Sequence, residues 1–221
     1  MRRIFVSRHL AAESPLRKWA TENDFALQAE SLLHFEPIPF HLPAESFDWV
    51  FFYSPRAVEF FYANCGELMF RSRLAAMGQG TANMLLKLGY EVAFIGNGSP
   101  EEVAVAFGQV AENHKVLFPR AEQSRRSVER YLEGRIKAVD LIVYRNEAKS
   151  PQGLKPSEIV VLTSPLNVAA YLAVCPAEPQ IKFFAIGPST AEALAKNGIL
   201  APYPAQPNEW AMVRLLDQWL R

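Results

Sequence analysis

The sequence predicts an α/β protein made of two similar, doubly wound parallel-sheet domains joined by two extended linkers. Short apolar runs alternate with segments of helical spacing, which is typical of a parallel sheet covered by helices. The chain of 221 residues also contains an internal repeat of about half its length. Two proline-bearing stretches, 35–40 and 144–156, interrupt the alternation and are predicted to be the linkers.

The repeat has the form strand, tight loop and helix, once in residues 49–58 and again in residues 159–168. Each copy continues with a second unit of the same form. Three residue pairs mark the repeat: Ser54 and Ser164 lie 110 residues apart, Gly78 and Gly187 109, and Pro100 and Pro207 107. Solenoid units are only about 20 to 50 residues long, so this repeat is the size of a domain.

The first elements follow from local signals. Residues 4–7 are predicted to form a strand, and Ser14 and Pro15 are an N-cap and a first helical residue. The helix carries Leu16, Trp19 and Ala20, and a second strand is expected at 27–33. Two prolines in residues 35–40 forbid a helix there and disfavour a central strand.

The middle of the chain continues the alternation. The expected strands are 48–53, 74–77, 92–95, 115–118 and 138–144, and the expected helices are 55–62, 81–88, 99–110 and 127–132. After the second linker the repeat recurs, and the chain ends in an amphipathic helix at 209–220, where Met212, Leu215, Leu216 and Trp219 share one face. The second copy has too few strands for its own sheet. We therefore expect a discontinuous domain, 1–36 with 150–221, and an inserted domain, 40–145.

Composition excludes some classes of protein. Half of the residues are hydrophobic and the formal net charge is zero, which indicates a globular protein without a basic surface for nucleic acid. No apolar run is long enough for a signal peptide or a bilayer span, so we expect a soluble, cytoplasmic protein. Cys65 and Cys175 stand alone and are expected to be reduced thiols.

Candidate binding residues lie where predicted strands end, because ligands of open parallel sheets bind there, at the N-termini of the following helices. The candidates are Ser7, Arg8, Ser54, Pro55, Gly78, Thr81, Arg120, Ser124, Thr163, Ser164, Gly187, Ser189 and Thr190. Unpaired amides at such helix starts suit carboxylates and phosphates. Ser-Pro and Ser-Thr at a helix start are also ordinary capping residues, so capping alone is the alternative for each of them.

Other chemistry has no signature in the sequence. It contains no Gly-rich dinucleotide motif, no P-loop, no zinc-protease motif and no nucleophile elbow. The histidines, which are His9, His34, His41 and His114, have no metal-ligand spacing. Tyr144, at the end of a predicted strand, is a phenol expected to face a cleft between the domains. Trp49, Phe51, Phe183 and Phe184 are expected to lie in the core.

Six segments together resemble the uroporphyrinogen-III synthase family. They are Phe51 to Val58, Met77 to Ala82 with Gly89, Val116 to Arg120 leading to Leu132, Val143 to Arg145, Leu162 to Pro165, and Ala185 to Ala191 with Gly198. The resemblance covers nearly the whole chain, and the order and spacing of the segments carry it. It implies two α/β lobes, an active site in the cleft between them, and neither cofactor nor metal.

The family's reaction, as the resemblance implies it, closes the linear tetrapyrrole hydroxymethylbilane with loss of water and inversion of ring D. The substrate carries eight carboxylates, which a set of helix N-termini would hold. The family pattern makes Tyr144 the candidate for hydrogen bonding to the leaving hydroxyl, with carboxylates held near Ser54, Thr81, Thr163, Ser164 and Ser189. Arg8 and Arg120 would add charge-assisted bonds. We further expect a monomer with a transient contact to hydroxymethylbilane synthase.

Two positions depart from the family pattern. Tyr53 stands where a threonine is more frequent, and Ala121 follows Arg120 where glycine is usual. Two other functions fit the same sequence. One is a non-catalytic, two-lobed binding protein for a small polyanion, and the other is a diverged regulatory partner of a tetrapyrrole enzyme, which the presence of Tyr144 disfavours.

Overall fold

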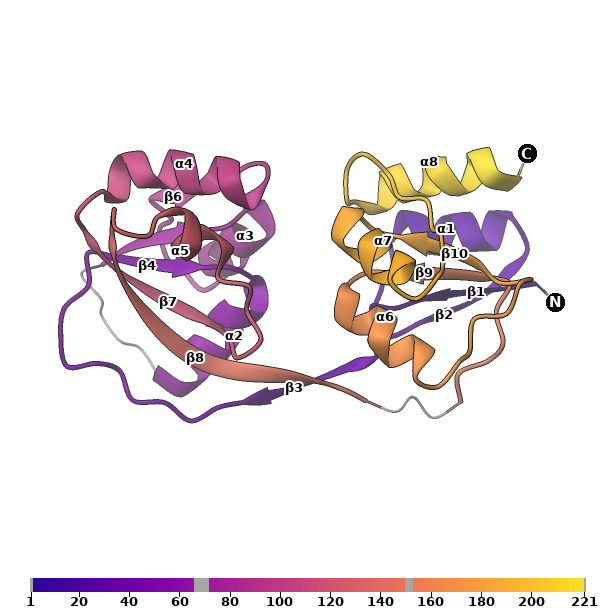
Figure 1. Ribbon diagram of the computed structural model, residues 1–221, viewed down its shortest axis with the longest axis horizontal. Coiled ribbons are helices and arrows are strands. Elements are labelled where there is room, and N and C mark those ends of the chain that lie inside the picture. The colour runs from indigo at the N-terminus through magenta and orange to yellow at the C-terminus, as the bar shows by residue number, and fades with distance from the viewer. Residues whose placement is uncertain (1, 66–71, 150–152, 221) are drawn as a thin grey trace. The chain divides into compact units, whose positions relative to one another are not determined.

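The computed structural model describes residues 2–65, 72–149 and 153–220, which form two compact units. Unit 1 consists of Met1–His34 and Glu147–Arg221, and unit 2 is the inserted segment Phe35–Asn146 (Figure 1). The α/β class with parallel sheets is confirmed. We had expected boundaries at 1–36 with 150–221 and at 40–145, whereas the units change over after His34 and after Asn146.

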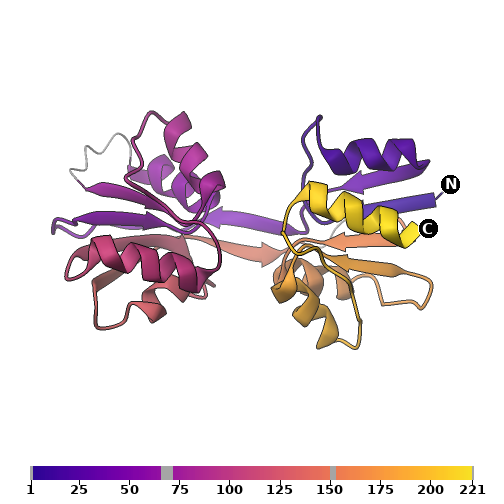
Figure 2. The same cartoon turned by 90° about the horizontal axis from the view of Figure 1, so that it is seen from above.

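Unit 1 is a four-stranded parallel sheet with helices on both faces (Figure 2). Its strands, in spatial order, are β10 (Lys182–Ala185), β9 (Ile159–Leu162), β1 (Arg2–Val6) and β2 (Phe25–Ala29). The helices are α1 (Pro15–Glu22), α6 (Pro165–Leu172), α7 (Pro188–Ala195) and α8 (Glu209–Leu220). Ile4 and Val6 pack under α1 and α8, while Phe5 points to the other face and contacts Tyr171 of α6.

Unit 2 repeats this plan with a six-stranded sheet. Its strands, in spatial order, are β3 (Leu33–Pro37), β8 (Lys137–Ala148), β7 (Lys115–Ala121), β4 (Trp49–Phe52), β5 (Arg73–Ala76) and β6 (Phe94–Ile95). The helices are α2 (Pro55–Cys65), α3 (Gln79–Lys87), α4 (Pro100–Ala111) and α5 (Ser127–Tyr131). Alternation along β4 fills both cores, because Val50 and Phe52 pack under α2 and α3 whereas Trp49 and Phe51 pack under α4.

All four strands of unit 1 have counterparts in unit 2. The order β10, β9, β1, β2 in unit 1 corresponds to β5, β4, β7, β8 in unit 2, where β6 and β3 extend the sheet at its two edges. Gly78 and Gly187 start equivalent helices with nearly the same backbone, φ −169° and ψ 177° against φ −171° and ψ 178°. The third repeat pair is not equivalent in detail, since Pro100 is the first residue of α4 whereas Pro207 precedes α8.

The predicted linkers contain more strand than expected. β3 includes Pro37 and lies at the sheet edge, beside β8. The two strands run antiparallel. The Ile38 amide donates to the Val143 carbonyl at 3.0 Å, and the Lys149 amide donates to the Leu32 carbonyl at 2.9 Å. β8 therefore continues to Ala148, although we expected it to end at residue 144. The middle of the second linker, 150–152, lies outside the described residues.

β7 is also longer than predicted, reaching Ala121 instead of ending at residue 118. We expected Pro119 to end the strand because proline cannot donate to a ladder. The β4 ladder, however, pairs only with Val116 and Leu117, so beyond them β7 has β8 as its neighbour on one side. The second predicted strand, 27–33, is divided in the structure into β2 and the start of β3.

The aromatic core was predicted correctly. Trp49, Phe51, Phe183 and Phe184 are all buried. Cys65 and Cys175 are free thiols, and burial raises the pKa of Cys65 to about 11. In the part of the chain that the structure describes, no helix is long and apolar enough to cross a membrane.

Candidate functional site

The candidate residues gather at one edge of each sheet, the edge where the parallel strands end, which we call the carboxyl edge. Ser54 and Gly78 follow β4 and β5 in unit 2, and Ser7, Thr163 and Gly187 follow β1, β9 and β10 in unit 1. Because the strands are parallel, these loops share an edge within each unit, as the sequence predicted.

Tyr144 lies within β8 and not at its end, which corrects the sequence-based expectation. The residue is only 7% exposed, with its ring stacked on Phe60 (centroids 5.1 Å apart) and close to Phe35 (6.1 Å). The phenol oxygen lies 3.4 Å from the Ser54 hydroxyl. Burial raises the pKa of Tyr144, so the phenol stays protonated and can donate a hydrogen bond.

Ser54 caps α2. Its hydroxyl accepts a hydrogen bond from the Ala57 amide at 3.2 Å, and Pro55 is the first helical residue. The same hydroxyl contacts the Tyr144 phenol. The residue that caps α2 is therefore hydrogen-bonded to a titratable side chain at the carboxyl edge of unit 2.

Ser164 caps α6 in unit 1 in the same way, accepting from the Asn167 amide at 3.1 Å. Its second partner is the side-chain amide of Asn167, at 2.9 Å, and the oxygen of that amide accepts from the Leu32 backbone at 3.1 Å. Asn167 is buried, so this serine is part of an internal network.

Gly78 and Gly187 start helices α3 and α7 without a side-chain cap. The amides of Thr81 and Thr190 bond back to the Gly78 and Gly187 carbonyls, each at 3.1 Å. The side chains of Thr81 and Thr190 are buried, whereas Ser189 is half-buried. Ahead of these bonded amides lie those of Gln79 and Gly80 in α3 and of Ser189 in α7, since Pro188 has no amide hydrogen. The helix starts present these amides at the carboxyl edge.

Ser7 and Thr163 bind each other. The Thr163 amide donates to the Ser7 hydroxyl at 2.8 Å, and the Thr163 hydroxyl donates to the Ser7 carbonyl at 3.0 Å. Ser7 is fully buried, so its side chain joins β1 to β9. That Ser7 contacts a substrate stays a prediction.

Arg8 forms an ion pair with Glu209, the first residue of α8, and Glu209 also accepts from the Ser14 hydroxyl. Burial opposes ionisation of Glu209, but hydrogen bonds from Ser14 and Arg8 hold its pKa below the usual range. Ser14 also caps α1 as predicted. This contact brings the start of α8 to the carboxyl edge beside β1.

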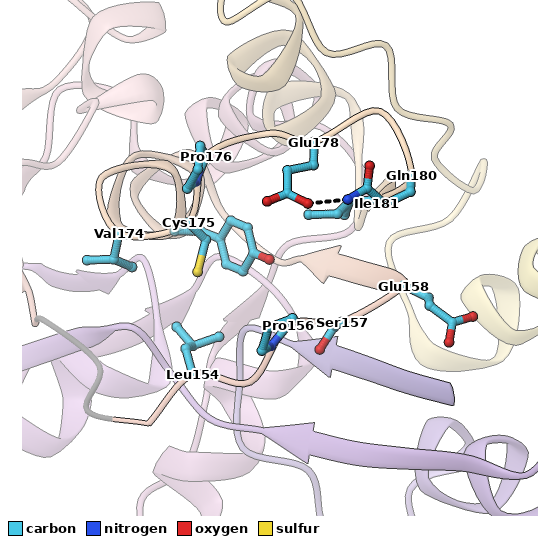
Figure 3. Close-up of a pocket in the computed structure, with 11 residues that line it drawn as sticks. Leu154, Pro156, Ser157, Glu158, Val174, Cys175, Pro176, Glu178, Gln180 and Ile181 are labelled. Carbon is cyan, nitrogen blue, oxygen red and sulfur yellow. Dashed lines mark hydrogen bonds between the residues drawn. The ribbon is translucent and has the colours of Figure 1, made fainter. Parts of the chain in front are cut away.

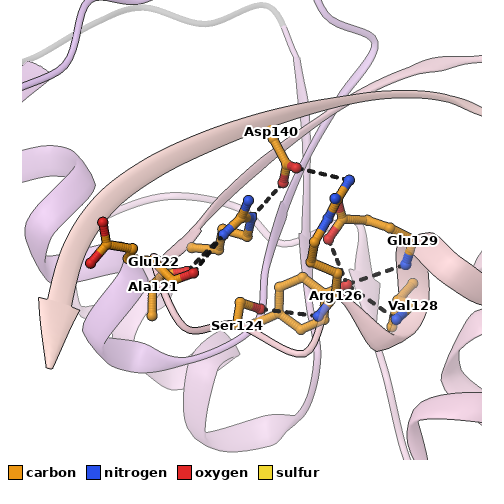
Figure 4. A network of polar contacts seen from close by, with 9 residues as sticks. Ala121, Glu122, Ser124, Arg126, Val128, Glu129 and Asp140 are labelled. Atoms are coloured by element: carbon orange, nitrogen blue, oxygen red, sulfur yellow. Dashed lines mark hydrogen bonds and ion pairs between the residues drawn. The ribbon is translucent and has the colours of Figure 1, made fainter.

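Arg120 is buried, and its guanidinium is engaged inside unit 2 beside Asp140, which Figure 4 shows together with Arg126 and Glu129. It pairs with Asp140 at 2.5 Å and donates to the carbonyls of Ala121 and Glu122 at 2.9 and 3.2 Å. Asp140 also pairs with Arg126 at 2.8 Å. Arg120 is thus held by a carboxylate of its own sheet, and its predicted contact with a substrate stays a prediction.

Glu129 continues this network. It pairs with Arg126 at 3.3 Å and accepts from the Tyr53 phenol at 3.2 Å. Burial, together with Asp140, raises the pKa of Glu129 to about 6. The Tyr53 phenol oxygen in turn accepts from the amides of Val128 and Glu129, which caps α5. Tyr53, which departs from the family pattern, therefore has a structural function.

Ser124 stabilises the loop before α5, since its hydroxyl accepts from the Arg126 amide at 3.3 Å. Arg126 has a left-handed backbone with φ 53°, which is uncommon for a residue other than glycine. Asn167, Glu209, Arg126 and Asp140 were not among the predicted site residues. Only Glu209 had a signal in the sequence, as the glutamate two residues after Pro207.

A pocket of about 300 Å³ lies in unit 1, near the residues that precede β9 and β10 (Figure 3). Leu154, Glu158, Cys175 and Ile181 are among its lining residues. It is therefore at the opposite edge from the candidate residues and contains none of them. Among the residues that the structure describes, no group of three or more His, Cys, Asp or Glu side chains could hold a metal ion.

Comparisons with known proteins agree with this arrangement. The family model described as "Uroporphyrinogen-III synthase HemD" matches residues 25–214. The crystal structure of uroporphyrinogen-III synthetase from Helicobacter pylori 26695 is 22% identical, with a TM-score of 0.79 and 100% coverage of both chains. A mutant uroporphyrinogen III synthase from the bacterium Thermus thermophilus is 13% identical, with a TM-score of 0.62 and coverage of 99% and 98%. At these identities the two structures show a shared fold. No curated protein matches the chain.

Proposed function

The chain belongs to the uroporphyrinogen-III synthase family, and from that membership we propose which of its residues bind and activate the substrate. The family is one of cyclising hydro-lyases of tetrapyrrole biosynthesis, and the chain acts on a linear tetrapyrrole. A non-catalytic binding protein is not favoured, because the family model covers most of the chain.

Carboxylates of the substrate bind at the first turns of α3 and α7. Gly78 and Gly187 support this assignment, because no contact among the described residues requires glycine at either position. Their φ angles are extended, which any residue adopts. An added Cβ would lie 3.9 Å from the nearest atom at Gly78 and 3.6 Å at Gly187, both ordinary contacts. A glycine at a helix N-terminus instead allows an anion to approach the backbone closely.

Ser54, Thr163 and Ser164 extend the carboxylate-binding edges through the backbone amides around them. Charge complementarity comes from helix dipoles at these positions and from Arg8, whose side chain is 38% exposed. Ser189 lies in the first turn of α7 and contributes its backbone amide there. The remaining candidates, which are Ser7, Pro55, Thr81, Arg120, Ser124 and Thr190, act by shaping these edges.

Tyr144 donates a hydrogen bond to the leaving hydroxyl of hydroxymethylbilane. The contact with Ser54 is the observation that carries this role, since it points the phenol oxygen toward the first turn of α2. A phenol whose pKa is raised by burial keeps its proton at neutral pH. Loss of water produces an electrophilic azafulvene, which the substituted position of ring D attacks. The resulting spiro intermediate fragments and recloses with ring D inverted. The protein contributes mainly by holding the reacting ends together.

The isomer of the product tests the function. Purified protein given freshly prepared hydroxymethylbilane should yield uroporphyrinogen III, whereas the uncatalysed closure yields the type I isomer. Chromatographic separation of the two isomers provides the measurement. Product with the type I pattern alone, at the rate seen without protein, would reject the assignment and favour a binding protein.

A cytoplasmic location, a monomeric state and a transient contact with hydroxymethylbilane synthase complete the proposal. The substrate closes spontaneously, so direct transfer from the enzyme that makes it would limit formation of the type I isomer. Light scattering of the purified protein, alone and mixed with hydroxymethylbilane synthase, tests the monomer and the contact together.

A further inference from the structure

Trp210 is a large apolar side chain that the fold leaves in solvent. It is the second residue of α8 and is 67% exposed. Tryptophan is on average one of the more buried residues, and an indole this exposed is accessible to a ligand. The buried side chains of α8, Ala211, Met212 and Leu216, lie on another part of the helix surface.

The start of α8 lies among the proposed substrate-binding residues of unit 1. Glu209, the residue before Trp210, pairs with Arg8 after β1. Pro207 lies beside the start of α7, since an added Cβ at Gly187 would be 3.6 Å from the Pro207 Cβ. The backbone of Trp210 is therefore at the carboxyl edge of unit 1, next to the Arg8–Glu209 ion pair and a helix N-terminus.

Trp219, at the other end of the same helix, differs in its surroundings. It is 43% exposed, but its ring makes an edge contact with Phe184 (centroids 5.8 Å apart), and the Lys182 ammonium lies 5.1 Å from its centroid. Lys182 is the first residue of β10, so Trp219 belongs to the opposite edge of the sheet. For Trp210 no ring or cation contact is found within the described part of the chain.

The chemistry of the substrate matches this free indole. A linear tetrapyrrole carries carboxylate arms on flat, electron-rich rings. Helix N-termini and Arg8 bind the arms but offer nothing to the ring faces. Because stacking on an indole is favourable for a flat ring, a tryptophan beside a carboxylate site recognises both parts of one pyrrole unit.

We propose that Trp210 stacks on a pyrrole ring of the linear tetrapyrrole while Arg8 and the first turn of α7 bind the carboxylates of that ring. This inference rests on the proposed function and deepens it. It makes Trp210 a substrate-binding residue that limits the motion of the open chain, and it predicts an effect on KM larger than the effect on kcat.

Steady-state kinetics on Trp210→Ala, with Trp219→Ala as the matched control, test the proposal. We expect Trp210→Ala to raise KM for hydroxymethylbilane about two- to tenfold, the range that corresponds to one aromatic contact, with kcat changed less. Trp210→Phe should restore most of the affinity. Trp219→Ala should leave KM unchanged. Equal KM values for the two alanine variants would overturn the proposal.

Fluorescence gives a readout independent of turnover. Uroporphyrinogen III, added under anaerobic conditions, should quench the indole emission of the wild type and of Trp219→Phe, but quench that of Trp210→Phe much less. Equal quenching in all three proteins would contradict stacking on Trp210. If the wild type bound this product with quenching but made only the type I isomer, the proposed function would fail while the stacking site remained.

Discussion

The first turns of α2 and α6 are capped in the same way, but each capping serine has a different second hydrogen-bond partner. Ser54 and Ser164 each accept from an amide three residues on, at 3.2 and 3.1 Å. Ser54 then faces the phenol of Tyr144, whereas Ser164 binds the buried amide of Asn167. The serine cap is therefore present in both units, but an ionisable phenol lies beside only the cap of unit 2.

The starts of α3 and α7, in contrast, remain alike in both units. Both have an extended glycine with room for a side chain. The comparison separates two requirements of the reaction. Under the proposed function, a substrate with many carboxylates would bind at equivalent edges in both units, whereas assistance to one leaving hydroxyl would need a single phenol. Four sets of substitutions test this distinction.

Tyr144→Phe should have the largest effect. Removing the phenol should lower kcat about tenfold or more, since general-acid assistance typically contributes at least that much. The melting temperature should change little, because the ring still packs against Phe60. Turnover with isomer analysis is the measurement, and Tyr131→Phe, an exposed phenol on α5, is the control. An unchanged kcat would remove Tyr144 from the mechanism.

Gly78→Ala and Gly187→Ala should each raise KM severalfold, because a methyl group would obstruct the approach of a carboxylate. Loss of stability should stay below about 1 kcal/mol at either helix start. Gly96→Ala provides the contrast, since its Cβ would lie 2.5 Å from the Met77 carbonyl oxygen and should lower the melting temperature. If KM stayed the same in both variants, the carboxylate sites would have to lie elsewhere.

Ser54→Ala and Ser164→Ala should each cost about 1 kcal/mol of folding stability through the lost cap. Only Ser54→Ala should also lower kcat, because only Ser54 contacts Tyr144. Urea unfolding and turnover, measured on both variants, separate the two effects. Equal losses of kcat would show that the asymmetry between the units has no bearing on catalysis.

Glu129→Gln should have the smallest effect, visible in the pH dependence of stability. Burial raises the pKa of Glu129 from 4.5 to about 6, so between these values the folded state binds more protons than the unfolded state. Its contribution to stability is therefore present below pH 4.5 and is lost as pH rises through 6. Thermal unfolding should show that the melting temperature of Glu129→Gln rises relative to that of the wild type between pH 4.5 and 6. A constant difference in melting temperature, as expected for the exposed control Glu133→Gln, would contradict the raised pKa.

Long-range contacts of the site could not be read from the chain. Tyr144 was expected at a strand end because the residues after it are polar, yet β8 continues through them. The edge strand β3 pairs with β8 through backbone groups, and an edge position tolerates polar side chains on both strands. Arg120 was expected in a loop as a substrate contact, but its strand continues and places it against Asp140.

Features that depend on neighbours within about four residues could be predicted from the sequence. The alternation of strands and helices, the caps at Ser14, Ser54 and Ser164, and the paired Gly78 and Gly187 are such features. Capping and periodicity are local interactions, so they leave a local pattern. Contacts between side chains far apart in the sequence, such as Tyr144 with Ser54 and Arg8 with Glu209, follow from the tertiary structure. Those contacts depend on strand order and register, which are set by burial over the whole sheet and not by any one segment.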